Sequence, residues 1–61
     1  MKYADLKVGM VVEDLIFANS TNHRGAGEVK KILKTRVHVD FKHHGVEVYD
    51  LAHLQFLKRP V

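Results

Sequence analysis

The feature that most constrains the fold is a strict alternation of apolar and polar side chains near the middle of the chain. Val37, Val39 and Phe41 alternate with His38 and Asp40. A period of two is typical of a β-strand that packs one face on a core and turns the other to solvent. We predict a strand over residues 35–42, with the three apolar side chains buried. Its outward side chains are then Arg36, His38, Asp40 and Lys42.

A second alternating run follows the short segment His43-His44-Gly45, which has the composition of a turn. Here the same reasoning predicts that Val46 and Val48 point inward and that Glu47 and Tyr49 point outward. The two runs would form a hairpin.

A glycine-led strand is predicted before this hairpin, over residues 27–33. Its apolar residues Val29 and Ile32 are three positions apart, which breaks the period of two. A β-bulge at Lys30-Lys31 repairs the pattern and lets a small sheet curl. A helix over residues 28–34 is the competing interpretation.

The remaining segments complete a small all-β domain of five strands over residues 1–61. Residues 6–12 are predicted as an entry turn and first strand with a bend at Gly9, and residues 18–27, rich in Asn, Ser, Thr and Gly, as a long loop. Residues 51–54 have the length of one 3-10 turn, and residues 55–58 make a short closing strand. The predicted core comprises Val29, Ile32, Val37, Val39, Phe41, Val46, Val48, Leu51 and Leu54.

The length and composition limit how such a domain is stabilised. A chain of 61 residues buries a small core, and with no cysteine it has no disulfide or thiolate metal site to reinforce it. No apolar run approaches the ~20 residues of a membrane span, and the first residues lack the apolar stretch of a signal peptide. We therefore expect a soluble cytoplasmic protein without membrane contact.

The spacing of apolar and glycine residues resembles that of SH3-like barrels of the Tudor and KOW type. The pattern is Leu6-x-Val8-Gly9-x-x-Val12, then Gly27-x-Val29-x-x-Ile32, Val37-x-Val39-x-Phe41 and Leu51-x-x-Leu54. The resemblance implies a five-stranded barrel with a long first loop and a 3-10 turn before the last strand. It also implies a partner surface made by that loop and adjacent strand faces. Free-standing domains of this kind occur among small phage or accessory proteins, here expected as a monomer or weak homo-oligomer.

Positive charge is concentrated in the middle of the chain. The formal net charge is +3, but residues 23–44 carry six basic and two acidic residues, a net of +4. Such a stripe favours binding to nucleic-acid phosphates with little base specificity. The predicted contacts are Arg24, Lys30, Lys31, Lys34, Arg36, His38 and Lys42, with Tyr49 stacking on a base or sugar. Two alternatives remain. One is a merely solvated basic face. The other is a protein-interaction module that engages a component of host or cellular nucleic-acid machinery through Leu15, Ile16 and Phe17 or through the aromatic face.

Catalysis and metal binding have little support in the sequence, and we expect no enzyme activity and no cofactor. Residues 46–54 look like the active-site strand of the plasmid-encoded type II dihydrofolate reductase, itself an SH3-like barrel, but that pattern has glutamine where this chain has Glu47. The neighbouring His43 and His44, with His38 and His53, raise the question of zinc. Zinc requires three or four convergent ligands, and adjacent histidines on an extended chain point apart, so no metal site is predicted.

Overall fold

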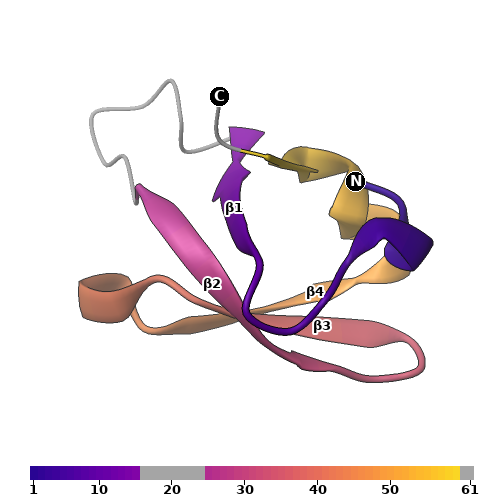
Figure 1. The fold of residues 1–61 in the computed structure, drawn as a ribbon, viewed down its shortest axis with the longest axis horizontal. Helices are drawn as coiled ribbons and strands as arrows, with labels where there is room; N and C mark the ends of the chain where they lie inside the picture. The colour runs from indigo at the N-terminus through magenta and orange to yellow at the C-terminus, as the bar shows by residue number, and fades with distance from the viewer. Residues whose placement is uncertain (16–24, 60–61) are drawn as a thin grey trace.

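The computed structural model describes residues 1–15 and 25–59, and its strands form one antiparallel sheet in the order β4-β3-β2-β1-β5 (Figure 1). The strands are β1 (Val11–Asp14), β2 (Ala26–Ile32), β3 (Arg36–Asp40), β4 (Val46–Asp50) and β5 (Leu57–Lys58). Within the described residues, three 3-10 helices accompany them: η1 (Tyr3–Asp5), η2 (Lys42–His44) and η3 (Leu51–Phe56). The predicted all-β class, the number of strands and the 3-10 turn before the last strand are confirmed. The first and last strands begin later than predicted, at Val11 rather than residue 6 and at Leu57 rather than residue 55. The alternative of a helix over residues 28–34 is wrong, because β2 covers residues 28–32 and the turn to β3 follows.

The sheet curls over its own core without closing. In Figure 1, β1 and η3 lie above the layer made by β2, β3 and β4. Strands β4 and β5 stand at opposite ends of the strand order, and the described residues form no ladder between them. The 3-10 helix η3 connects these two strands along the chain. The arrangement is therefore a strongly bent open sheet.

The predicted bulge in β2 is present. Val29 lies opposite Val39 and Lys31 lies opposite His38, so Lys30 is the extra residue of the β2 strand. The bulge keeps Val29 on the core side while both Lys30 and Lys31 are exposed. The bend at Gly9 is also confirmed, since that residue has a φ of +91° in the left-handed region that favours glycine.

Gly27 leads β2 because the core leaves no room for a side chain there. A Cβ atom at this position would lie 2.6 Å from Cγ1 of Val39 and 2.8 Å from two ring carbons of Phe41. The glycine thus allows the backbone of β2 to approach the side chains of Val39 and Phe41 closely.

The core is only partly as predicted. Val29, Val37, Val39, Phe41 and Leu54 are buried as expected, and Ile32 is half-buried. Burial of the other three predicted residues is wrong: Val46, Val48 and Leu51 are 56%, 50% and 50% exposed. The core instead includes four residues outside the predicted set: Leu6, Val12, Tyr49 and Leu57.

The direction of the side chains along β4 is therefore opposite to the prediction, and the hairpin register explains why. The N–H of Phe41 donates to the carbonyl of Gly45 at 2.9 Å, and beyond this turn Val46 lies opposite Asp40. Opposed residues share a face of the sheet, so Tyr49 joins Val37 in the core and Val48 joins His38 outside. The Tyr49 hydroxyl donates to Oδ2 of the buried Asp14 at 2.5 Å, which gives this inward phenol a polar partner on β1.

Candidate nucleic-acid interface

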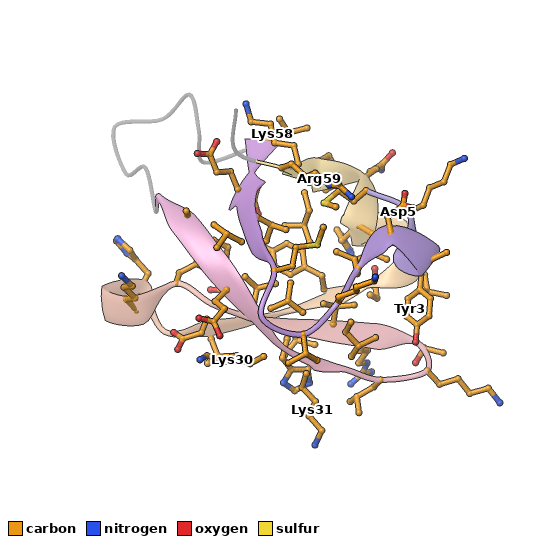
Figure 2. All side chains as sticks on the ribbon, in the orientation of Figure 1. Tyr3, Asp5, Lys30, Lys31, Lys58 and Arg59 are labelled. Carbon is orange, nitrogen blue, oxygen red and sulfur yellow. The ribbon has the colours of Figure 1, made fainter. Side chains whose placement is uncertain are left out.

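The basic side chains predicted to bind phosphate belong mainly to one surface, the side of β2, β3 and β4 that points away from the core. We call this surface the outer face. Lys30 and Lys31 extend from it in Figure 2, away from the core. Three rows of opposed residues cross it: Glu28, Asp40 and Val46; Lys31, His38 and Val48; Arg36 and Asp50. The outer face is therefore mixed in charge, with apolar valines along its β4 border.

Each acidic residue of the outer face is engaged by a local partner. Nζ of Lys30 lies 3.0 Å from Oε2 of Glu28. The backbone N–H of Lys42 donates to Oδ1 of Asp40 at 2.8 Å. Glu28 and Asp40 therefore interact with neighbouring groups and not with the other cations of the outer face.

Asp50 is engaged by the helix that follows it. Its Oδ1 accepts the backbone N–H of His53 at 3.0 Å and lies 2.5 Å from Nδ1 of the same residue. The hydrogen bond from the His53 side chain, helped by backbone N–H donors and the histidine charge, lowers the pKa of the Asp50 carboxyl below its ordinary value. Asp50 therefore caps η3 although it stands opposite Arg36 in the register.

Lys30 forms an ion pair with a carboxylate of its own strand, Glu28. The pKa of the Lys30 ammonium is raised, chiefly by the hydrogen bond to Glu28 and also by the negative charges of Glu28 and Asp40. Lys42 lies nearby, and both lysines line a groove of about 250 Å³ together with Glu28, Asp40 and the small residues at the start of β2. The groove combines two cations with two carboxylates, so it has little net attraction for an anion.

Lys31, Lys34 and Arg36 are cations of the predicted set that do not line this groove. All three are exposed, and none forms an ion pair with a carboxylate in the described part of the chain. Lys31 is on β2 beside the bulge, Arg36 is the first residue of β3, and Lys34 lies in the turn between them. His38, half-buried, lies opposite Lys31. The three exposed cations thus gather around one end of the β2–β3 hairpin.

The structure changes the predicted set of contacts in two places. Tyr49 was predicted to point outward and stack on a base; the outward orientation is wrong, because the residue is 7% exposed and belongs to the core. Lys30 and Lys42 are on the predicted surface but lie among carboxylates. Arg24 falls outside the described residues, as does most of the predicted 18–27 loop. The exposure of Val46 and Val48 was missed, and only the hairpin register could have revealed it.

A metal site and a membrane-spanning helix are both absent from the described residues. No group of three or more His, Asp or Glu side chains among them is placed to hold a metal ion. Within the same ranges no helix has the length and apolar character needed to cross a membrane.

Comparison with known proteins gives no further assignment. No protein-family model matches the chain, and neither a curated protein nor a solved structure matches it.

Proposed function

We propose that this protein is a small non-enzymatic module that binds nucleic acid through backbone phosphates, with little base specificity. The observation that carries the proposal is the pattern of pairing on the outer face. Its acids are each bound locally, while Lys31, Lys34 and Arg36 are exposed and have no carboxylate partner among the described residues. Exposed cations of this kind release counterions from nucleic acid when they neutralise its phosphates, which favours binding.

The proposal ranks the basic residues. Lys31, Lys34 and Arg36 supply most of the affinity, because no carboxylate among the described residues forms an ion pair with them. Lys30 supplies less, since its ammonium already contacts Glu28 at 3.0 Å. The ranking separates phosphate binding from a general effect of net charge.

Two double variants with unchanged net charge test this ranking. Lys31→Ala with Asp5→Asn removes an unpaired cation of the outer face and, as compensation, an exposed acid of η1 (Figure 2). Glu28→Ala with Lys30→Ala removes an ion pair. We expect the first double variant to bind every oligonucleotide more weakly and to lower the salt slope by about 0.9. The second should retain an affinity close to that of the wild type. Equal losses in both variants would contradict the proposal.

A second candidate is a protein-interaction module, favoured by the border of the outer face. Strand β4 ends the sheet and exposes Val46 and Val48, 56% and 50% accessible. Edge strands with exposed apolar side chains are suited to pairing with another chain. The originally predicted contact segment is only partly described: Leu15 is 41% exposed, and Ile16 and Phe17 lie outside the described residues.

Chemical-shift mapping distinguishes the two candidates. Oligonucleotide binding should perturb the amides around Lys31 and Arg36 at low salt and lose this effect at high salt. If these amides stay unperturbed at both salt concentrations, the nucleic-acid proposal is wrong and the β4 border becomes the better candidate.

A further inference from the structure

We infer that the preferred ligand is double-stranded rather than single-stranded nucleic acid. This inference rests on the proposed function and specifies the ligand of the same surface. The shared chemistry is a rigid double line of phosphates, which duplex DNA and duplex RNA both provide.

The argument begins with the positions of the aromatic rings. Phe41 and Tyr49 are both buried and face each other with ring centroids 6.5 Å apart. Phe56 is half-buried on η3, with its ring centroid 6.0 Å from that of His53. Tyr3 is partly exposed on η1, and its hydroxyl donates to the carbonyl of Leu33 at 2.7 Å. Within the described ranges, no phenylalanine or tyrosine therefore presents its ring on the outer face.

Among the residues of β2, β3 and β4, only His38 places a ring on the outer face. That residue is half-buried between Lys31 and Val48 in its cross-strand row. A single, half-covered imidazole offers a poor platform for successive bases.

This arrangement removes the main advantage of single strands as ligands. Proteins that bind single strands gain about 1–3 kcal/mol for each base stacked on an aromatic side chain. Where the described residues of the outer face offer no stacking platform, affinity depends on phosphate neutralisation. Each phosphate contact then contributes more on a duplex, with a salt slope of about −0.9 per contact against about −0.7 on a single strand. The outer face therefore discriminates in favour of the duplex.

Fluorescence anisotropy at low salt tests the inference with four probes of equal phosphate number: duplex DNA, duplex RNA, oligo-dT and oligo-U. We expect both duplexes to bind more tightly than both single strands. The comparison between the two duplexes shows whether a DNA or an RNA backbone is preferred. Single strands that bind as tightly as duplexes would overturn the inference while leaving the proposed function intact. Absence of binding to all four probes would instead refute the proposed function.

A gain-of-function variant tests the physical reason. Val48→Tyr adds an exposed ring to the outer face beside His38. If a missing ring limits single-strand binding, this variant should bind oligo-dT roughly five- to a hundredfold more tightly, the equivalent of one stacked base. The matched control is Gln55→Tyr, which places an exposed ring on η3, across the core from β2 and β3 (Figure 1). Equal behaviour of the two folded variants would contradict the inference.

Discussion

Single residues control how closely the layers of this small domain approach. Gly27 is the clearest case, because a Cβ atom there would meet Val39 and Phe41 at 2.6 and 2.8 Å. Replacing glycine by alanine usually stabilises a compatible position by restricting the unfolded chain. Here we expect Gly27→Ala to lower the free energy of unfolding by about 1–3 kcal/mol through overpacking. Urea denaturation measures it, with Ala26→Ser at the exposed neighbour as control; a Gly27→Ala variant as stable as the wild type would contradict the packing described.

The pair formed by Tyr49 and Asp14 is a second determinant at this scale. The phenol donates to a carboxylate that is 5% exposed, so the bond forms between two buried groups. Tyr49→Phe should cost about 1.5–3 kcal/mol of unfolding free energy, the value of a hydrogen bond to a charged group. A double-mutant cycle with Asp14→Asn measures the coupling. If the two substitutions are additive, the hydrogen bond is not a significant source of stability.

At the scale of the elements, the strands differ in how far sequence alone could define them. The alternation at Val37, Val39 and Phe41 was sufficient to orient β3, and the broken period between Val29 and Ile32 correctly located the bulge in β2. Strand β4 could not be oriented in this way. Its valines fit the same pattern, but a one-residue change in hairpin register exchanges the two faces. Two contacts decide the orientation of β4. The turn at Gly45 depends on loop geometry, and the hydrogen bond between Tyr49 and Asp14 joins residues far apart in the sequence.

The orientation of β4 leads to a prediction about two chemically identical substitutions. Val48→Thr lies on the outer face, so the free energy of unfolding should change by no more than about 0.5 kcal/mol. Val39→Thr buries a hydroxyl in the core and should cost about 1–3 kcal/mol. Both keep a β-branched side chain, which controls for strand propensity. If urea denaturation shows a larger loss of unfolding free energy for Val48→Thr than for Val39→Thr, Val48 points inward, as the sequence pattern predicted.

The cap of η3 gives an expected pH dependence. The pKa of the Asp50 carboxyl is lower in the folded protein, chiefly because of the hydrogen bond from His53, than its ordinary 3.8. Its contribution to stability is therefore present above that value and is lost as the pH falls through the folded pKa. Asp50→Asn should remove this part of the pH dependence while keeping a capping side chain. Denaturation from about pH 6 to about pH 2 should show the difference between the two proteins shrinking; a constant difference would argue against the ionised cap.

At the scale of the whole molecule, the distribution of charge along the chain indicated the region of the candidate interface but not which basic residues belong to it. Counting charges placed Lys30, Lys31 and Lys42 together. The fold separates them, because the register sets Glu28 opposite Asp40 and brings Lys30 to Glu28. The burial of Tyr49 likewise depends on the register. Such pairings are long-range properties of the folded sheet, so a linear pattern of basic residues overestimates the cations available to a ligand.

The central claim is that a few unpaired cations on the outer face bind phosphate, and the salt dependence of duplex binding tests it most directly. Three contacts, from Lys31, Lys34 and Arg36, predict a slope of log affinity against log salt of roughly −2 to −3. The Lys31→Ala, Arg36→Ala double variant should reduce this slope to about −1. Binding that is absent at low salt, or that does not change with salt, would contradict the account.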